Sequence, residues 1–367
     1  MSLLTRRRPG EAVDLEAVRR AAGAVPDPEL HLSLADAGML GEVELDRAGV
    51  ALVTVRLTTP TCPMRDRLVA DVGDAVRTVP GVTDVRVTFG EMGDGERIAL
   101  ASRLRAGRET GHPFGPDSRT AIYAVASGKG GVGKSTVTAN LAVALAQQGK
   151  RVGVLDADVW GYSVPQLFGV RERPVALKGL MMPVQAHGVA LMSVGFLVDD
   201  GQPVVWRGPM LHKAIEQFLS DVHWGELDVL LIDLPPGTGD VTLSLLELLP
   251  DAQLLAVTTP QVAAEVVATR VGRMALDSRM PIAGVIENMS GGIFGEGGGA
   301  RLAASIGAPL LGRIGLDVAL RTAGDAGVPG VVAAPGSAAV AELRQIAGTL
   351  PVVRRSLVGR SLPLSVV

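Results

Sequence analysis

Nine residues, GKGGVGKST at 128–136, constrain this chain more than any other part of its sequence. They match the pattern Gly-x-x-x-x-Gly-Lys-[Ser/Thr], and they follow an apolar segment that predicts a strand and open a segment that predicts a helix. The glycines let the backbone curl with its N–H groups facing inward, and the N-terminus of the helix adds positive potential. The pattern therefore predicts a loop that cradles the phosphates of a nucleotide.

The residue types in the loop assign chemical roles. Lys134 is expected to reach the β- and γ-phosphates, and Ser135 to ligate Mg²⁺. ATP and Mg²⁺ are therefore the expected cofactors. The nucleotide-binding residues expected from the loop are Gly128, Lys129, Gly130, Gly131, Val132, Gly133, Lys134, Ser135 and Thr136.

Two further apolar segments, 152–155 and 229–232, are each followed directly by an aspartate, Asp156 and Asp233. The carboxyl ends of parallel strands meet at one edge of a sheet, which is where such folds bind their ligands. Asp233 and Asp156 are therefore expected beside Ser135 as Mg²⁺ ligands, with Asp233 acting through water. Asp158 is expected to orient the attacking water and to be catalytic together with Lys134. Capping of a loop or helix is the alternative role for each carboxylate.

Strands alternate with helices in residues 120–350, which predicts an α/β domain with a doubly wound, mostly parallel sheet. Short apolar segments predict its buried strands at 121–126, 152–155, 229–232, 254–258, 282–286 and 309–311. Helices are expected at 134–148, 211–221, 241–248, 261–278 and 300–306.

A smaller α+β domain is expected at 11–103, with helices near 11–24 and 64–79 and strands at 42–45, 50–58 and 82–89. Arginine, glycine and proline mark 104–119 as an interdomain linker. Residues 351–367 are expected to form a flexible tail.

Composition excludes several classes of protein. The 367 residues carry a formal net charge of −3 and only 3% aromatic side chains, which argues against a nucleic-acid partner. No apolar run is long enough to cross a bilayer, and no signal peptide is apparent, so a cytoplasmic protein without a membrane partner is expected. A single cysteine excludes an intramolecular disulfide.

Lys129, directly after the first glycine, narrows the class. This deviant Walker A loop resembles that of the dimerising P-loop ATPases, which include cell-division and plasmid-partitioning proteins. The resemblance implies a homodimer in which Lys129 reaches the ATP of the partner protomer, much as an arginine finger does. It also implies that ATP holds the dimer together and that hydrolysis releases it.

Several segments narrow the resemblance to the Mrp/NBP35 (ApbC-like) iron–sulfur cluster carrier ATPases. They are DADVWGYSVPQLFG at 156–169, VVWRGPMLHKAIEQFL at 204–219, LDVLLIDLPPGTGDV at 227–241 and VIENMS at 285–290. The N-terminal domain resembles the MIP18-type domain through LTTPTCP at 57–63. The resemblance implies that Asn288 reads the adenine edge, with capping of a loop as the alternative. It also implies iron–sulfur client apoproteins or an assembly scaffold as partners.

One feature of that family is missing here. Its carriers use a Cys-x-x-Cys pair between the ENMS and FGxGG segments, and this chain runs directly from Ser290 through two glycines to Ile293. An iron–sulfur cluster takes about four ligands, normally thiolates, and two protomers would offer only two. Cys62 is therefore either a buried small hydrophobe or a reactive thiolate. In the second case a transient cluster shared with a partner and a Cys62 pair in a dimer both stay open.

The expected function is that of a dimeric Mg²⁺-dependent ATP hydrolase that carries or assembles iron–sulfur clusters without the family's Cys-x-x-Cys ligands. One alternative is a positioning or partition-type ATPase, which would need an amphipathic C-terminal helix or a basic face. The other is a metabolic ATP-dependent enzyme, which would need a substrate pocket with further catalytic residues.

Overall fold

The computed structural model describes residues 13–28, 30, 32–58, 64–105, 112–115, 118–197 and 208–351. The chain divides into two compact units. The first comprises Met1–Arg108 with Val175–Met182, and the second comprises Glu109–Pro174 with Pro183–Val367.

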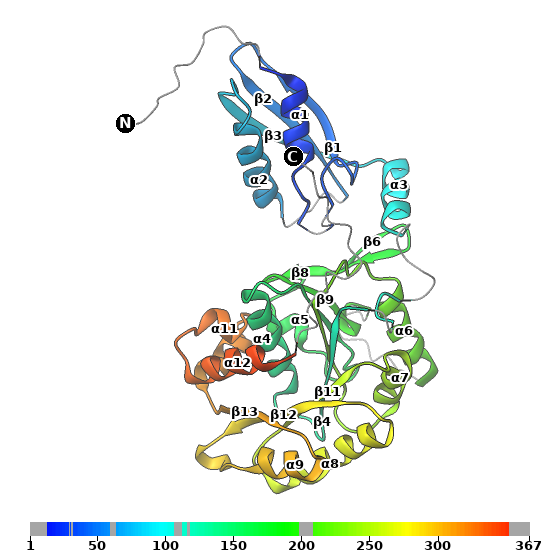
Figure 1. Cartoon of the computed structure of the whole chain (residues 1–367), viewed down its shortest axis with the longest axis vertical. Coiled ribbons are helices and arrows are strands. Elements are labelled where there is room, and N and C mark those ends of the chain that lie inside the picture. Colours follow the sequence, from blue (N-terminus) through cyan, green and yellow to red (C-terminus); the bar gives the residue numbers. More distant parts are fainter. Residues whose placement is uncertain are drawn as a thin grey trace, which may run out of the picture. The chain divides into compact units, whose positions relative to one another are not determined.

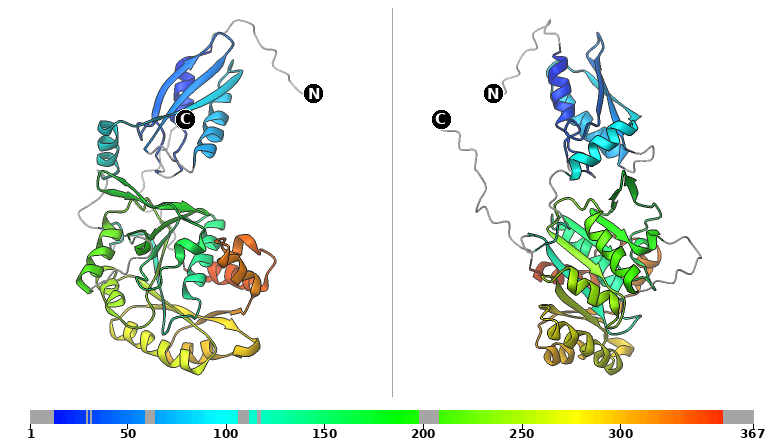
Figure 2. Two further views of the ribbon diagram at one scale, coloured as in Figure 1. Left: turned by 180° about the vertical axis from the view of Figure 1, so that it is seen from behind. Right: turned by 90° about the vertical axis from the view of Figure 1, so that its right-hand side faces the viewer.

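The first unit is a three-stranded sheet with its helices packed into one core (Figures 1 and 2). Its elements are α1 (Leu15–Gly23), β1 (Leu40–Leu45), β2 (Val50–Leu57), α2 (Arg65–Arg77), β3 (Asp84–Glu91) and α3 (Asp94–Arg105). The central strand β2 pairs antiparallel with β1 and parallel with β3. Alternate residues of β2, Ala51, Val53 and Val55, are fully buried, as the period of two along a strand requires.

A short hairpin from later in the chain completes this core. Strands β6 (Val175–Leu177) and β7 (Leu180–Met182) pair antiparallel, and their Leu177, Leu180 and Met182 are buried with the first unit's apolar residues. The sequence expectation placed these residues in the second domain. Three-residue strands give too short an alternation to be recognised from sequence.

The second unit contains an eight-stranded sheet in the order β13-β12-β11-β4-β10-β5-β9-β8. The strands are β4 (Ala121–Ser127), β5 (Val152–Asp156), β8 (Val184–Ala186), β9 (Val189–Ser193), β10 (Val229–Asp233), β11 (Gln253–Thr258), β12 (Ile282–Ser290) and β13 (Leu310–Gly315). All pairs are parallel except the edge pair β8–β9. The doubly wound, mostly parallel sheet expected from the sequence is confirmed.

Helices cover both faces of this sheet, and Figure 1 shows α4, α11 and α12 on one side with α6 and α7 on the other. The helices are α4 (Lys134–Gln147), α5 (Val164–Leu167), α6 (Gly208–Ser220), α7 (Asp240–Leu248), α8 (Val262–Asp277), α9 (Gly298–Ile306), α10 (Val318–Asp325), α11 (Gly330–Ala333) and α12 (Ala338–Thr349). Two 3₁₀ turns, η1 (Val194–Leu197) and η2 (Gly292–Phe294), complete the unit. Within the described residues, none of these helices is both long and apolar enough to span a bilayer.

Strands β8 and β9 extend the sheet beyond the six strands expected from the sequence. All five residues of β9 are buried, and β9 pairs in parallel register with β5. This additional strand matters for the site, because it brings Ser193 level with Asp156.

Candidate functional site

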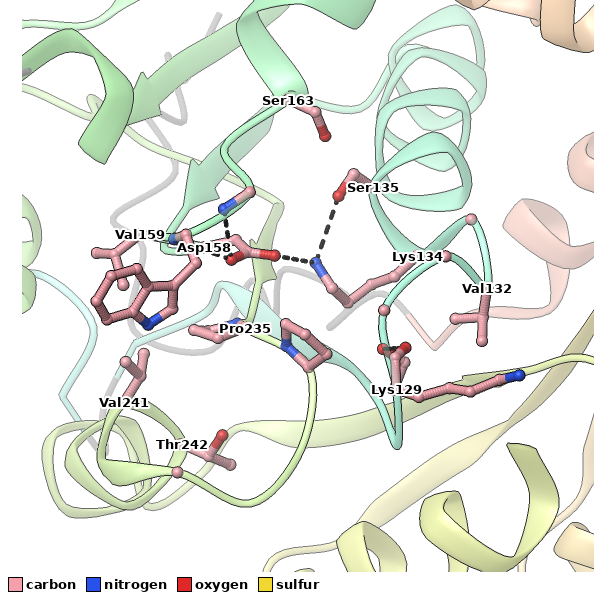
Figure 3. A pocket seen from close by; sticks show the side chains of 18 of the residues that line it. Lys129, Val132, Lys134, Ser135, Asp158, Val159, Ser163, Pro235, Val241 and Thr242 are labelled. Atoms are coloured by element: carbon pink, nitrogen blue, oxygen red, sulfur yellow. Dashed lines mark hydrogen bonds and ion pairs between the residues drawn. The ribbon is translucent and has the colours of Figure 1, made fainter. Parts of the chain in front are cut away.

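A pocket of about 600 Å³ opens at the carboxyl ends of β4, β5 and β10 (Figure 3). Its walls come from the glycine-rich loop, from the segment after β5 and from the segment after β10. The lining residues from those segments are Ser127, Lys129–Thr136, Asp158–Gly161, Ser163, Pro235, Pro236, Gly239, Val241 and Thr242, joined by Leu211 of α6. The carboxyl edge of a doubly wound sheet is the location that the fold favours for a ligand.

Glycine is required at two positions of the loop, at Gly128 because of the space available and at Gly133 because of the backbone conformation. A Cβ on Gly128 would lie 2.3 Å from the backbone nitrogen of Ala268 in α8, so the loop can pass this helix only without a side chain. Gly133 has a φ of +80° and precedes the first residue of α4. A left-handed residue there turns the chain into the helix, whose free N–H groups then face the pocket.

Lys134 is held by the acidic residues that surround it. Its Nζ donates to Oδ2 of Asp233 at 2.8 Å, donates to Oγ of Ser135 at 3.3 Å, and lies 3.5 Å from Oδ2 of Asp158. Its side chain is only 6% exposed. Figure 3 shows Lys134 and the Asp158 carboxylate pointing toward each other across the pocket. The ammonium expected to bind phosphate is therefore paired with two carboxylates.

Asp233 is the centre of this network and is fully buried. Its Oδ2 accepts from Lys134 and also from Oγ of Ser135 at 2.6 Å, while Oδ1 accepts from Oγ1 of Thr138 at 2.8 Å. Thr138 lies one turn after Lys134 on α4 and was not among the expected site residues. Its spacing of four from the loop lysine is the signal that could have identified it.

Asp156 is level with Asp233 on the neighbouring strand and with Ser193 on the next. Its Oδ2 accepts from Oγ of Ser193 at 2.9 Å, and its Oδ1 accepts from the backbone N–H of Asp158 at 3.1 Å. Burial, with the nearby negative charge of Asp233, raises the pKa of Asp156 to about 7. The carboxylate is thus held close to its titration point near neutral pH.

Asp158 accepts two backbone N–H groups through Oδ1, from Trp160 at 3.3 Å and from Gly161 at 3.1 Å. Its other oxygen faces Lys134, and its side chain is 8% exposed. The expected role of Asp158 with the attacking water stays a prediction. Its capping of the loop and its position in the pocket wall occur together, so the two roles suggested by the sequence are compatible.

The remaining expected residues lie apart from this carboxylate cluster. Lys129 is exposed and points away from Lys134 in Figure 3. Asn288 is 5% exposed, and its Nδ2 donates to the carbonyl of Val132 at 2.8 Å. Its expected contact with adenine stays a prediction. Cys62 and the tail from residue 352 onward lie outside the described residues, as do residues 106–111, 116 and 117 of the expected linker.

The oxygen donors in the pocket fit Mg²⁺. Mg²⁺ in nucleotide sites keeps several waters and takes one or two protein oxygens together with the phosphates. Ser135 Oγ and Asp233 Oδ2 are already 2.6 Å apart at the base of the loop. Among the described residues no group of three His, Cys, Asp or Glu side chains is arranged to hold a metal ion by itself. A hydroxyl with a carboxylate is the set that a magnesium–nucleotide complex requires.

A phosphate-binding loop between a central parallel strand and a helix, with a buried aspartate at the end of the adjacent strand, defines a P-loop NTPase. Comparison with family models makes the assignment more specific. The chain belongs to the family described as NUBPL iron-transfer P-loop NTPase, whose model matches residues 118–351. A second model, described as iron-sulfur cluster assembly protein, matches residues 15–89. Both resemblances expected from the sequence are confirmed.

Curated relatives are similar in sequence over nearly the whole chain. Proteins named iron-sulfur cluster carrier protein are 49% identical in Mycobacterium bovis, over 95% of this chain and 96% of that protein, and 45% identical in Deinococcus radiodurans, over 91% and 94%. Among solved structures, a nucleotide-binding protein from Archaeoglobus fulgidus in complex with ADP is 38% identical, with a TM-score of 0.50 over 56% of this chain and 86% of that one. The cell division ATPase MinD of Pyrococcus furiosus shares the fold at 24% identity, with a TM-score of 0.50 over 62% of this chain and 97% of that one.

Proposed function

We propose that this chain is a Mg²⁺-dependent ATPase that acts as a homodimer in carrying or assembling iron–sulfur clusters. The observation that carries the proposal is the Lys134–Asp233–Ser135 network beneath the glycine-rich loop. Relatives that match both units of the chain are named as cluster carriers, and a similar structure contains ADP. These comparisons do not favour a positioning ATPase or a metabolic enzyme.

The network implies how the site responds to nucleotide. Lys134 must leave Asp233 and turn toward the β- and γ-phosphates, where its charge offsets theirs. Its departure leaves Oδ2 of Asp233 available together with Ser135 for the metal side of the nucleotide. Bound Mg²⁺ would supply charge neutralisation at the phosphate oxygens. Asp158, already fixed by two backbone N–H groups, is the group that would orient water.

The dimer is proposed from Lys129. Its side chain is exposed and is directed away from the carboxylates of its own pocket (Figure 3). A lysine at this place in a phosphate loop acts most simply on a nucleotide held by a second copy of the chain. Its compact ammonium would stabilise charge that develops on that nucleotide during hydrolysis.

Two lysine variants test the ATPase, with Lys150→Ala as the matched control because Lys150 lies at the amino ends of the strands. Lys134→Ala is expected to lose nucleotide binding, measured with a fluorescent ADP analogue. Lys129→Ala is expected to bind ATP yet to hydrolyse it at least about tenfold more slowly, the scale of a lost charged contact. Hydrolysis by Lys129→Ala at the wild-type rate would rule out the action of Lys129 across a dimer.

The cluster part of the proposal is tested separately, because one cysteine per chain limits the ligands. Two copies would supply two thiolates from Cys62, and a client protein would supply the rest of the set of about four. Iron and sulfide analysis of anaerobically purified dimer with a client apoprotein should show iron that Cys62→Ser lacks. Iron at background in the wild type, with nucleotide binding intact, would remove the carrier role and leave an ATPase.

A further inference from the structure

Two consecutive residues at the end of β12 hold two different loops. Side chains alternate along a strand, so Glu287 and Asn288 point to opposite faces of the sheet. Asn288 reaches the phosphate loop, and Glu287 reaches the glycine-rich segment that follows the strand. Both side chains are buried, and neither lines the nucleotide pocket.

The side chain of Asn288 is packed tightly against the phosphate loop. Its Nδ2 donates to the carbonyl of Val132 at 2.8 Å, and a Cβ on Gly133 would lie 2.2 Å from the same nitrogen. Val132 and Gly133 belong to the curl that would surround bound phosphates. Any change in the position of this peptide must therefore move Asn288 or break its hydrogen bond.

Glu287 holds the segment that follows the strand through three hydrogen bonds. Its Oε1 accepts from Oγ of Ser290 at 2.7 Å and from the N–H of Gly297 at 3.2 Å, while Oε2 accepts from the N–H of Gly299 at 2.6 Å. Arg313 Nε lies 3.9 Å from Oε1. The carboxylate is fully buried, so it fixes both ends of residues 290–299, the glycine loop, to β12.

The glycine loop takes its shape from its glycines. Gly291, Gly292, Gly295 and Gly297 all have positive φ values, which glycine adopts without steric cost. At its tip Ile293 is 90% exposed. The loop is therefore an exposed surface element, closed by the hydrogen bond from the N–H of Gly291 to the carbonyl of Gly295 and held at its ends by Glu287.

We propose that the end of β12 couples the nucleotide site to the glycine loop, with Glu287 as the positioning residue of this coupling. Bound phosphates fix the Val132–Gly133 peptide, which fixes Asn288 and the end of the strand, and the strand end in turn fixes Glu287 and the loop. Met289, between Asn288 and Ser290, has a φ of +57°, so the strand end has a defined kink through which a shift is transmitted. The exposed face of the loop thus reports whether nucleotide is bound.

This inference rests on the proposed function, because it requires nucleotide binding. Amide hydrogen exchange of the full chain is therefore measured with and without Mg²⁺–ADP, and nucleotide binding is measured on the same sample. The amides of Gly297 and Gly299 are expected to exchange at least about fivefold more slowly when nucleotide is bound, the lower end of usual coupling between sites. Unchanged exchange at these amides with nucleotide bound would overturn the coupling. Failure of the wild type to bind nucleotide would instead overturn the proposed function.

Variants locate the coupling in Glu287. Glu287→Gln is expected to bind nucleotide but to lose the nucleotide-dependent protection of Gly297 and Gly299. Ser290→Ala, which removes one contact of Glu287, should lose part of the protection even if Glu287→Gln fails to fold. Ser305→Ala is the matched control, because its hydroxyl bonds only within this part of α9 and α8. Full protection in both Glu287→Gln and Ser290→Ala would show that the loop responds without this carboxylate.

Discussion

Replacing Thr138 with valine removes a hydroxyl that hydrogen-bonds to the buried carboxylate of Asp233 and to the backbone carbonyl of Lys134. Thr138 Oγ1 donates to Oδ1 of Asp233 at 2.8 Å, both side chains are fully buried, and valine has the same shape as threonine. A hydrogen bond to a charged group contributes about 1.5–3 kcal/mol, and the acceptor left behind has no water to replace it. We therefore expect the free energy of unfolding to fall by about 2 kcal/mol.

The same bond fixes the rotation of Asp233, and with it the oxygen shared with Ser135. If all of the bond's free energy served that orientation, Mg²⁺ would bind about 30-fold more weakly in the presence of nucleotide, since about 1.4 kcal/mol corresponds to tenfold. We expect about tenfold, because the hydroxyl of Ser135 still holds the other oxygen of Asp233 when Lys134 has turned to the phosphates.

The assay is a Mg²⁺ titration of a bound fluorescent ADP analogue, paired with urea unfolding. Thr138→Ser keeps the hydroxyl and is the matched control, so it should titrate like the wild type. Equal Mg²⁺ dependence of Thr138→Val and Thr138→Ser would refute the reasoning, whatever the change in unfolding, because it would show that Asp233 is oriented without Thr138.

Three further outcomes are expected. The folded-state pKa of Asp156 is about 7 against an ordinary 3.8, so the folded state binds more protons between these values. The free energy of unfolding should therefore fall as pH rises from about 4 to about 7. Asp156→Asn should flatten this profile in urea unfolding. Burial would raise the pKa of Glu287, but hydrogen bonds from Ser290, Gly299 and Gly297 with the charge of Arg313 hold it below its usual value, so its stabilisation should be lost as pH falls below about 4.5. Gly133→Ala should destabilise the fold by at least about 1 kcal/mol and abolish nucleotide binding, because its φ is +80° and its Cβ would meet Asn288.

Local patterns in the sequence predicted the central features of the second unit. The glycine-rich loop, the strand before it and the helix after it are neighbours in sequence, so glycine freedom and apolar periodicity are enough to place them. Asp156 and Asp233 could be predicted because each ends an apolar strand, and the structure brings them level on adjacent strands. By contrast, no local pattern predicted that Lys134 would be bound to Asp233, since that contact depends on side chains 99 residues apart.

The contact between Asp156 and Ser193 could not be predicted, for a reason specific to parallel sheets. Asp233, Asp156 and Ser193 occupy one row across β10, β5 and β9, and only the register of these three strands determines that row. A shift of one residue in β9 would turn Ser193 to the other face and leave Asp156 without its hydroxyl donor. The ends of the strands can thus be located from apolar segments of the sequence. Tertiary packing determines which polar residue lies beside which carboxylate. The hydroxyl group of Ser193 is the part of this site that only the folded register could reveal.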